Sequence, residues 1–294
     1  MAKRVFQGSL VALVTPFRDG KVDEATLKQL VEFQIRGGTD AIVPCGTTGE
    51  SPTLDHAEHN HVVDVVIEAV DRRIPVVAGT GSNSTAEAIS MTRHAKEAGA
   101  DAALIVLPYY NKPTQKGMIE HCRKIADTVD LPLILYNIPG RTGVNMTPET
   151  LAQLADHPNI VGMKEATGSL EQMTQDIVLC GEKLSFLSGD DVLTLPLMSV
   201  GGKGIISVVA NIVPKDVADM THAFLSGDWK RARELHLKLF PLCQAMFYET
   251  NPIPVKTALA MMGKVREEFR LPLCPMTDAN RKRLEAALQS YGLL

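Results

Sequence analysis

The sequence has little of what attracts a protein to nucleic acid or to a membrane. Its 30 lysines and arginines are outnumbered by 34 aspartates and glutamates, and the formal net charge is −4, with no basic stripe. A concentrated positive charge is the usual electrostatic signature of both kinds of partner. No apolar run approaches the roughly 20 residues of a membrane span, and residues 1–7 lack the apolar core of a signal peptide. We therefore expect neither partner, and a place in the cytoplasm.

Cysteine is scarce, and its spacing excludes two kinds of framework. The five cysteines lie far apart, at positions 45, 122, 180, 243 and 274, without a Cys-x-x-Cys pair. An odd and scattered set argues against disulfides and against a thiolate zinc site. His56 and His59 stand three residues apart in a helical pattern, which is one arrangement that metal ligands take. Because no third ligand accompanies them, we expect no metal and favour solvated or interface histidines.

Short apolar stretches recur along the first two thirds of the chain, each followed by a helical pattern. The chain has 294 residues, 45% of them apolar, which is enough for one large barrel or two ordinary domains. We predict eight strands, at residues 9–15, 41–45, 75–79, 102–107, 132–136, 160–164, 185–188 and 204–209. Eight strand–helix units in succession predict an α/β fold of the (β/α)8 TIM barrel type, whereas a doubly wound sheet more often has five or six strands.

Helix boundaries can be predicted from capping residues. Asp23, Thr53 and Thr147 are the expected N-caps, residues 84–87 form an expected capping box, and glycines at 37–38, 99 and 181 mark helix ends. After Pro214 the pattern is helical only, at residues 215–225, 229–248, 255–262 and 277–288. We predict a barrel domain over residues 1–227 and a small C-terminal α-helical domain over residues 228–294, in firm contact with the barrel.

Lys164 stands out because it ends a predicted buried strand. Residues 160–163 are apolar or small, and Thr167 and Gly168 follow shortly after the lysine. Desolvation of an ammonium group is costly, so a dry site favours the neutral amine, which attacks carbonyls and forms Schiff bases. The alternative is that the flexible stem carries the amine out to water, as lysine stems commonly do. The lysine alone leaves both interpretations open.

Polar residues gather where the predicted strands end, and in a barrel the loops after the strands carry the chemistry. Three of the five tyrosines, at 109, 110 and 136, fall in or beside these loops. Phenols within reach can relay the protons that imine formation moves. The Gly-Thr-Thr-Gly stretch at 46–49 is either an anion-binding turn or a simple turn before a helix. Arg141 is suited to clamp a carboxylate, although a lone arginine is more often a surface residue.

Six motifs together resemble the dihydrodipicolinate synthase family, which belongs to the class I pyruvate aldolases of the N-acetylneuraminate lyase superfamily. The motifs are Gly-Thr-Thr-Gly-Glu-Ser at 46–51, Pro-Tyr-Tyr-Asn at 108–111, Tyr-Asn-Ile-Pro-Gly-Arg-Thr at 136–142, Lys-Glu-Ala-Thr at 164–167, Ser-Gly-Asp-Asp at 188–191 and Asn-Pro-Ile-Pro-Val-Lys at 251–256. The resemblance covers essentially the whole chain. It implies condensation of pyruvate with L-aspartate 4-semialdehyde to 4-hydroxy-tetrahydrodipicolinate, an early step of diaminopimelate and L-lysine biosynthesis.

The resemblance also implies catalytic roles. Lys164 forms the imine with pyruvate, so neither a metal nor an organic cofactor is needed. Tyr136 acts as the central acid and base, and Thr48 links it to Tyr110 in a proton relay. Tyr110 crosses a subunit interface to complete the neighbouring site, which implies a homotetramer built as a dimer of dimers.

Further residues are implied in substrate binding. Thr47 and Thr48 hold the carboxylate of pyruvate, and the carbonyls of Gly189 and Ile206 line the pocket. Arg141 receives the carboxylate of the aldehyde substrate. This arginine separates the implied activity from relatives whose second substrate is a polyhydroxylated aldehyde.

Lysine-inhibited members of the family have a feedback site for L-lysine at the dimer interface. The matching positions in this sequence are Ser51, His56, His59, Asn83, Glu87 and Tyr109. A glutamate is a sensible partner for the ammonium group of a ligand. Pro52 stands where a small residue is typical of this turn, and proline fixes the backbone there. The resemblance therefore implies inhibition by L-lysine.

Two other interpretations compete with this one. Another pyruvate-dependent aldolase, such as N-acetylneuraminate lyase or a 2-keto-3-deoxy sugar acid aldolase, would share the lysine and the tyrosine but use a sugar aldehyde. A barrel without catalytic activity, binding a keto acid as a sensor or scaffold, belongs to a different class. The joint presence of Lys164, Tyr136, Tyr110 and Thr48 argues against it, because a binding protein needs no proton relay.

Overall fold

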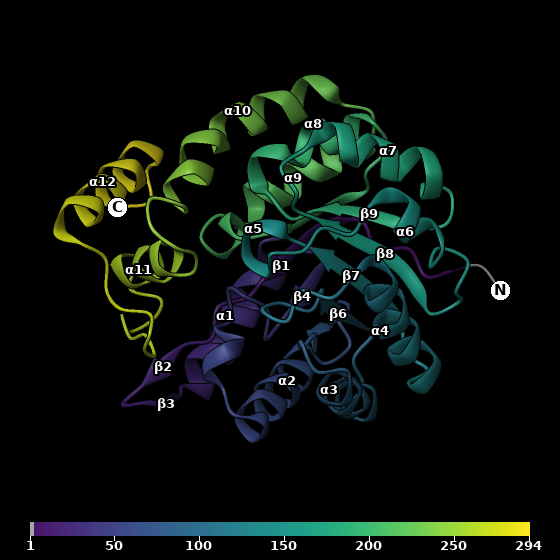
Figure 1. Cartoon of the computed structure of the whole chain (residues 1–294). Coiled ribbons are helices and arrows are strands. Elements are labelled where there is room, and N and C mark those ends of the chain that lie inside the picture. Colours follow the sequence, from purple (N-terminus) through teal and green to yellow (C-terminus); the bar gives the residue numbers. More distant parts are fainter. Residues whose placement is uncertain (1–2) are drawn as a thin grey trace.

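Eight parallel strands form the centre of the fold (Figure 1). In the computed structural model, which describes residues 3–294, they are β1 (Gly8–Ala12), β4 (Ala41–Val43), β5 (Val77–Gly79), β6 (Ala102–Val106), β7 (Leu133–Asn137), β8 (Ile160–Glu165), β9 (Ser185–Ser188) and β10 (Gly204–Ser207). Their order in the sheet is β4-β1-β10-β9-β8-β7-β6-β5, and a parallel bridge between Ile42 and Val76 joins its two edges. The sheet closes on itself, which confirms the predicted (β/α)8 barrel.

Helices cover the outside of the barrel (Figure 1). They are α1 (Glu24–Arg36), α2 (His56–Val70), α3 (Thr85–Ala98), α4 (Gln115–Thr128), α5 (Pro139–Thr142), α6 (Pro148–Ala152), α7 (Leu170–Cys180), α8 (Thr194–Ser199) and α9 (Pro214–Leu225), with three short 3₁₀ turns, η1 (Ser51–Thr53), η2 (Asp191–Leu193) and η3 (Val209–Asn211). A two-stranded hairpin of β2 (Phe17–Arg18) and β3 (Lys21–Val22) was not predicted. Over residues 3–294, no helix combines the length and apolar character that a membrane span requires.

The predicted helix starts hold at most positions and fail at one. Asp23 and Thr147 are N-caps, as predicted, and each side chain accepts a hydrogen bond from a backbone N–H of the first turn. The prediction of Thr53 as an N-cap is wrong. Thr53 ends η1, and Asp55 caps α2 in a reciprocal capping box with Glu58. The chain makes a short 3₁₀ turn before this helix, so the true cap lies two residues later.

The predicted capping box of α3 is only half formed. The Ser84 side chain accepts a hydrogen bond from the Glu87 backbone N–H, as an N-cap does. The Glu87 carboxylate accepts a hydrogen bond of 2.7 Å from the Ser82 hydroxyl instead of reaching back to Ser84. Glu87 is thereby turned toward a cavity that is described below.

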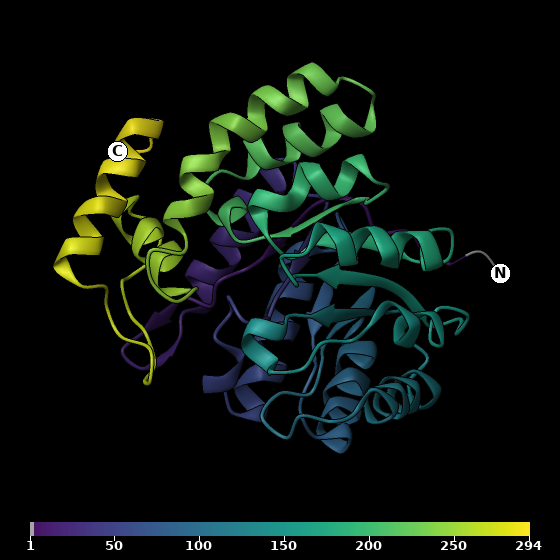
Figure 2. The same ribbon diagram turned by 45° about the horizontal axis from the view of Figure 1, so that its top comes forward.

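Three helices follow the barrel and lie to one side of it (Figure 2). They are α10 (Trp229–Ala245), α11 (Ile253–Met261) and α12 (Asp278–Tyr291), which confirms the predicted all-helical end of the chain. Helix α10 packs against α9 of the barrel, and α11 and α12 pack against each other. We propose a domain boundary between residues 227 and 228, because this position lies in the turn between α9 and α10.

The barrel strands have apolar side chains on both faces. Leu10, Val43, Leu104 and Leu187 belong to an inner cluster that fills the barrel. Their neighbours along the strands belong to a larger cluster between the sheet and the surrounding helices. Because both faces are buried, the strands appear in the sequence as continuous apolar runs, and this made all eight detectable.

One strand departs from regular alternation. Leu133 of β7 pairs with Ile160 of β8, but the next residue of β7, Ile134, pairs with Gly162. Strand β8 therefore contains one extra residue, Val161, which has no pairing partner in β7. Such a β-bulge changes the face to which all later side chains of the strand point.

The bulge turns Lys164 into the barrel. Ile160 belongs to the outer cluster, and regular alternation from it would place Lys164 on the outer face as well. After the bulge, Lys164 pairs with Tyr136 on one side and Leu187 on the other, and both of these belong to the inner cluster. Met163 faces the helices instead. The direction of the lysine thus depends on a single inserted residue.

We expect Gly162→Ala to disturb the bulge. A Cβ at Gly162 would lie 2.7 Å from the carbonyl oxygen of Ser185 in β9, so β8 and β9 would have to separate. Overpacking of this kind costs about 1–3 kcal/mol of stability. The free energy of unfolding, measured by urea denaturation, should fall by that amount. Gly140→Ala is the control, because a Cβ there meets nothing within 4 Å. Equal stability of the two variants would contradict this account of the bulge.

Candidate active site

Lys164 is buried at the carboxyl end of β8. Its side chain is in the barrel interior, and the residue is only 5% exposed. Burial lowers the pKa of its ammonium group to about 7, while the nearby Asp191 carboxylate raises it and Arg141 lowers it further. The interpretation in which this lysine reaches out to water is therefore wrong. At neutral pH a substantial fraction of the amine is unprotonated, which is the nucleophilic form.

Tyr136 lies directly against this amine. The Nζ atom of Lys164 is 4.3 Å from the centroid of the Tyr136 ring, and the two residues pair across β7 and β8. Burial raises the pKa of the Tyr136 phenol to about 12, while Arg141 and a hydrogen bond with the Thr47 side chain lower it. The phenol is therefore protonated at neutral pH. It can donate a proton to an oxygen that forms on an adduct of Lys164.

The two adjacent threonines take different positions. The Thr47 side chain bonds the phenol of Tyr136, while the hydroxyl of Thr48 accepts a hydrogen bond of 3.0 Å from Nδ2 of Asn251. Thr48 is 2% exposed, and its hydroxyl is bonded by the C-terminal segment. The position that was expected to link the tyrosines, Thr48, is thus corrected to Thr47. Adjacent residues of a turn point in different directions, and the sequence alone does not show which one faces the tyrosine.

A tight turn carries these threonines. The N–H groups of Gly49 and Glu50 donate to the carbonyls of Gly46 and Thr47, at 3.1 Å each. Glu50 closes the turn with a φ of 54°, in the left-handed region. The hydroxyl of Thr15 donates to the carbonyl of Gly49 at 2.7 Å and fixes the turn to the end of β1. The sequence 46–49 is therefore a defined turn at the barrel mouth.

Gly189 and Ile206 lie at the ends of the neighbouring strands. A Cβ on Gly189 would lie 2.6 Å from Cβ of Ala166 and 3.2 Å from Cε of Lys164, so glycine lets the backbone pass close to Ala166 and the lysine stem. Ile206 is fully buried in the inner cluster. Gly189 therefore lies beside the reactive amine and Ile206 in the barrel core, and neither is among the residues that line the cavity at the barrel mouth.

Asp191 is a site residue to which the sequence analysis assigned no role. Its carboxylate accepts hydrogen bonds from the Ser207 hydroxyl at 2.5 Å and from the backbone N–H groups of Val208 and Val209 at 3.0 and 3.2 Å. These bonds join the ends of β9 and β10. The same carboxylate raises the pKa of Lys164, although burial outweighs this effect. The signal in the sequence was an acidic residue three positions after a buried strand.

The three tyrosines at the mouth are not equivalent. Tyr109 and Tyr136 line a cavity at the barrel mouth, whereas Tyr110 is 90% exposed on its surface. Tyr110 has a φ of 71°, which is strained for a bulky side chain. A single copy of the chain therefore brings two of the three phenols to the cavity and leaves Tyr110 in solvent.

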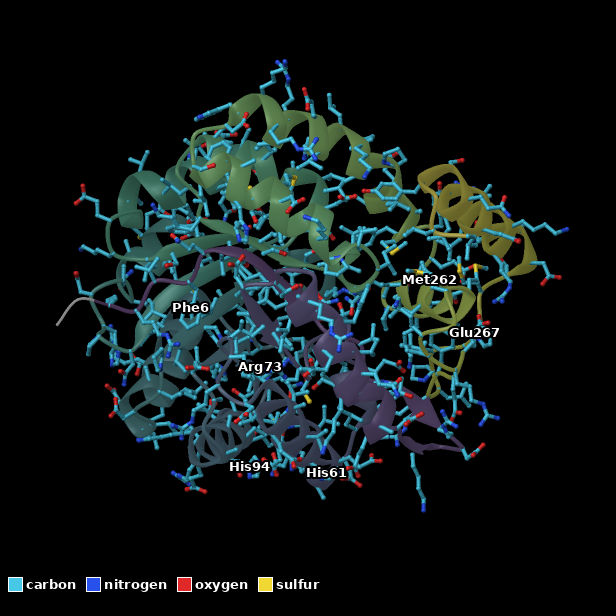
Figure 3. The ribbon with its side chains drawn as sticks, turned by 180° about the vertical axis from the view of Figure 1, so that it is seen from behind. Phe6, His61, Arg73, His94, Met262 and Glu267 are labelled. Carbon is cyan, nitrogen blue, oxygen red and sulfur yellow. The ribbon has the colours of Figure 1, made fainter. Side chains whose placement is uncertain are left out.

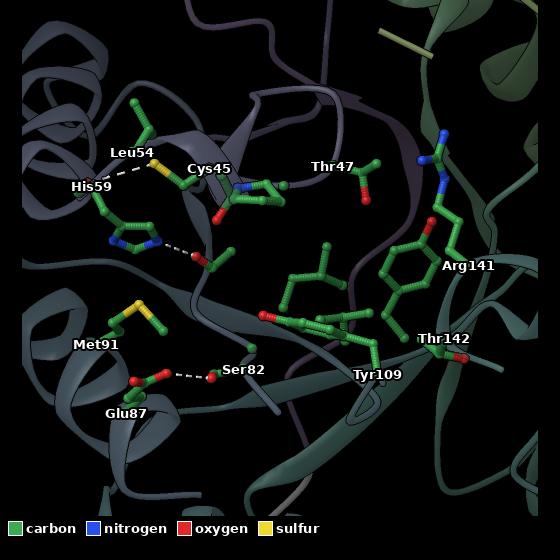
Figure 4. Close-up of a pocket in the computed structure, with 18 of the residues that line it drawn as sticks. Cys45, Thr47, Leu54, His59, Ser82, Glu87, Met91, Tyr109, Arg141 and Thr142 are labelled. Carbon is green, nitrogen blue, oxygen red and sulfur yellow. Dashed lines mark hydrogen bonds between the residues drawn. The ribbon is translucent and has the colours of Figure 1, made fainter. Parts of the chain in front are cut away.

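The cavity, with a volume of about 360 Å³, has two ends (Figure 4). Thr47 and Arg141 lie at the first end, which we call the mouth end, together with Tyr136. The second end, which we call the histidine end, lies between α2 and α3. The lining of the cavity includes five of the six residues expected at a lysine-binding site: Ser51, His56, His59, Glu87 and Tyr109. The sixth, Asn83, donates a hydrogen bond of 3.1 Å to the carbonyl of Tyr109.

The two histidines of the His-x-x-His pattern differ in environment. His56 is exposed, but His59 is 3% exposed and its Nε2 shares a hydrogen bond of 2.8 Å with the carbonyl of Gly79. Burial lowers the pKa of His59, so its ring is neutral. Within residues 3–294, no group bonds its Nδ1, and no three His, Cys, Asp or Glu side chains gather as metal ligands would. Of the two histidines, only His56 is therefore solvated, whereas His59 is buried.

A second buried acidic group lies behind the lysine. Glu165 and Asp176 are 0% and 1% exposed, and the charge of Glu165 acts on Asp176, whose two carboxylate oxygens meet no hydrogen-bond partner among residues 3–294. Burial, followed by the charge of Glu165, raises the pKa of Asp176 to about 8. The sequence offered a signal that we missed: Met173, Asp176 and Cys180 form the buried stripe of α7, where an aspartate is unusual.

The fold and the site together define a class of enzyme. A (β/α)8 barrel with a dry lysine at a strand end, beside a buried phenol, has the arrangement of a class I aldolase, which activates carbonyl substrates as lysine imines. The model of the dihydrodipicolinate synthetase family matches residues 5–291. A relative from Geobacter sulfurreducens, described as a 4-hydroxy-tetrahydrodipicolinate synthase, is 61% identical over 290 residues, covering 99% of this chain and 100% of the relative. The chain belongs to the dihydrodipicolinate synthetase family.

Solved structures of relatives agree in fold over the whole length. The chloride-inhibited dihydrodipicolinate synthase from Acinetobacter baumannii, complexed with pyruvate, is 48% identical with a TM-score of 0.96, covering 98% of this chain and 99% of that one. DHDPS from Cyanidioschyzon merolae with lysine bound is 42% identical with a TM-score of 0.95, covering 99% and 100%. The barrel and the C-terminal helices thus both belong to the shared fold.

We expect Asp176→Asn to stabilise the protein in alkaline solution. The pKa of Asp176 is raised from 3.8 to about 8 in the folded state, so between these values the unfolded chain releases a proton that the folded chain retains. Stability therefore falls as pH rises through this window, and the penalty is complete above pH 8. The variant should gain about 1–3 kcal/mol over the wild type at pH 9 and little near pH 4.

Thermal melting at both pH values measures this difference. Asp130→Asn, the same change at an exposed position, is the control and should alter neither melting temperature. An Asp176→Asn variant that gains as much at pH 4 as at pH 9 would show that ionisation of the buried pair is not the cause.

Proposed function

We propose that this chain condenses pyruvate with L-aspartate 4-semialdehyde to give 4-hydroxy-tetrahydrodipicolinate, a step of diaminopimelate and L-lysine biosynthesis in the cytoplasm. The observation that carries the proposal is the amine of Lys164, buried, with a pKa lowered to about 7 and 4.3 Å from the ring of Tyr136. The family of the chain and its 61% identical relative support the choice of substrates. The reaction needs no metal or organic cofactor, because the lysine imine is itself the electron sink.

In the first step, the neutral amine of Lys164 attacks the keto carbon of pyruvate. A carbon–nitrogen bond forms, and the former carbonyl oxygen takes up protons and leaves as water. The buried phenol of Tyr136 is the proton donor within reach of that oxygen. The N–H groups and hydroxyls of the turn 46–49 are suited to hold the carboxylate of pyruvate in the attack geometry.

In the second step, the cationic imine draws electrons from the methyl group of pyruvate. A proton leaves that carbon, and the resulting enamine attacks the aldehyde carbon of the second substrate. The aldehyde oxygen becomes a hydroxyl group. The amino group of the second substrate then displaces Lys164 from the imine carbon, which closes the six-membered ring and restores the free lysine.

Arg141 is the group in this proposal that selects the second substrate. Its Nη2 donates a hydrogen bond of 3.0 Å to the carbonyl of Asn251, which orients the guanidinium at the mouth end of the cavity. A guanidinium recognises a carboxylate by two parallel hydrogen bonds. L-aspartate 4-semialdehyde has such a carboxylate next to its amino group. A sugar aldehyde, which the related aldolases use, offers hydroxyl groups instead.

We also propose that two copies of the chain complete each other's sites in a homotetramer. Tyr110 is 90% exposed, and its φ of 71° is strained, which suits a side chain held by contacts outside its own subunit. From the neighbouring copy, its phenol would extend the proton relay that Tyr136 and Thr47 begin. One solved relative, 42% identical, is described as a monomeric dihydrodipicolinate synthase variant, so the assembly has to be measured.

The histidine end of the cavity suits L-lysine as a feedback inhibitor. The Glu87 carboxylate can receive the ammonium group of a ligand, and Nδ1 of the buried His59, which meets no bonding group among residues 3–294, is available to the ligand. A relative with lysine bound shares 42% of its sequence with this chain. End-product inhibition is the role that this binding would serve.

We expect pyruvate and borohydride to trap a reduced adduct on Lys164. Because only the neutral amine attacks and the pKa of Lys164 is about 7, the trapping rate should rise with pH through about 7 and level off above it. An ordinary lysine would continue to gain reactivity up to its pKa of about 10.4. Intact-mass measurement followed by peptide mapping gives both the rate and the modified residue.

Two variants test the assignment of roles. Lys164→Ala should give no adduct, and Tyr136→Phe should give the same adduct about 100-fold more slowly or worse. Turnover with L-aspartate 4-semialdehyde but not with a sugar aldehyde would exclude the related aldolases. A folded wild type that forms no adduct would overturn the proposed reaction and favour a keto-acid-binding barrel.

We expect millimolar L-lysine to slow the initial rate, and Glu87→Gln to raise the half-inhibitory concentration about tenfold, since the variant loses a charge-assisted hydrogen bond. Glu97→Gln, an exposed change on the same helix, is the control and should leave inhibition unchanged. Sedimentation of the same samples should show a tetramer. The absence of inhibition would refute the regulatory site, and a monomer would refute the assembly.

A further inference from the structure

A lysine of the C-terminal segment is more deeply buried than the lysine of the active site. Lys256 of α11 is fully buried, and its Nζ forms an ion pair of 2.5 Å with Oε1 of Glu50, whose side chain is fully buried too. The same Nζ lies 4.3 Å from the ring centroid of Phe17 and 5.1 Å from that of Phe269. An apolar enclosure of this kind leaves Glu50 as the main partner for the charge.

A buried ion pair of this kind is weak evidence for stability. Removing two charges from water costs several kcal/mol per ion, and apolar side chains of similar volume often stabilise a fold as well or better. The position of Glu50 suggests what the pair does instead. Glu50 closes the turn 46–49 in a left-handed conformation, and its N–H donates to the carbonyl of Thr47 at 3.1 Å. The ion pair therefore holds the residue that shapes this turn.

Other atoms of the C-terminal segment hold the same structure. Asn251 donates from Nδ2 to the hydroxyl of Thr48 at 3.0 Å, and its carbonyl accepts from Arg141. The backbone N–H of Arg270 donates to the second oxygen of Glu50 at 3.3 Å. All of these contacts reach the barrel mouth from residues 251–270, which belong to the proposed C-terminal domain. The turn is thus fixed from outside the barrel.

We propose that Lys256 is a positioning residue: its ion pair with Glu50 sets the turn 46–49 in the geometry in which Thr47 meets the phenol of Tyr136. Lys256 does not touch the substrates, and it acts only through Glu50 and the turn. The inference rests on the proposed function, because Thr47 and the turn matter through the pyruvate that they would hold. The inference gives the C-terminal segment a part in catalysis, although this segment is far from Lys164 in the sequence.

Replacement of the whole pair is the main test. Lys256→Met alone leaves Glu50 buried without its partner, which costs about 3–5 kcal/mol and endangers folding. The double variant Glu50→Gln/Lys256→Met removes both charges and keeps the volumes, so it should fold. Its kcat/KM for pyruvate should fall about 10- to 100-fold through a higher KM and a lower kcat, since small misplacements of reacting groups have effects of this size. Its KM for the aldehyde should change much less.

A second ion pair in the same segment controls for general loss of stability. Arg281 makes two hydrogen bonds of 2.6 Å to Glu267, which lies in the C-terminal part (Figure 3). Glu267→Gln/Arg281→Met removes a more exposed ion pair of the same segment, which does not reach the turn. This control should lower the melting temperature and keep the kinetic constants of the wild type. Glu50→Asp is a third variant, which keeps both charges but shortens the link by one methylene, and it should raise the KM for pyruvate.

The outcomes separate the two proposals. If the wild type forms the borohydride adduct and a folded variant of the Glu50–Lys256 pair keeps the KM for pyruvate and the kcat of the wild type, Lys256 is structural only and this inference is wrong. If the variants lose activity only in proportion to unfolding, as the control pair does, it is wrong as well. If the wild type forms no adduct, the proposed function itself fails.

Discussion

The desolvation of one amine is the constraint on which the site depends. Lys164 belongs to the apolar interior of a closed barrel, and this environment lowers its pKa to about 7 against the opposing charge of Asp191. A barrel is suited to this task, because eight strands surround their shared interior and exclude water from it. The bulge in β8 supplies the remaining element, since it turns the lysine from the helix-facing side to the interior.

The acidic groups near the lysine are arranged so that they do not cancel this effect. The carboxylate of Asp191 accepts hydrogen bonds from Ser207 and from two backbone N–H groups. These bonds stabilise its negative charge locally and weaken its effect on the amine. Glu165 follows Lys164 directly, and burial raises the pKa of its carboxyl group and that of the neighbouring Asp176. A fully ionised pair there would favour the ammonium form of the lysine. Burial thus raises the pKa of the carboxyl groups behind the amine and lowers the pKa of the amine itself.

The sequence predicts what depends on composition along the chain and misses what depends on orientation. The eight strands were found because runs buried on both faces are apolar throughout, and the six motifs identified the family. Thr48 was preferred to Thr47 because neighbouring residues of one type are distinguished only by the direction of each side chain in the turn. Thr53 failed as a cap because the 3₁₀ turn η1 delays α2 by two residues. The inward direction of Lys164 depends on a bulge that leaves no mark in the sequence.

Tyr110 is a predicted site residue that a single chain leaves outside the cavity. A left-handed backbone at a bulky residue costs about 1–3 kcal/mol, and such strain persists only where the surroundings impose it. Within one copy the residue is 90% exposed, so its own subunit offers little that could impose the strain on the side chain. Contacts with a second copy would supply this constraint and remove a large aromatic ring from water in the same step. The strain and the exposure of Tyr110 therefore both argue that the complete site belongs to an assembly rather than to one chain.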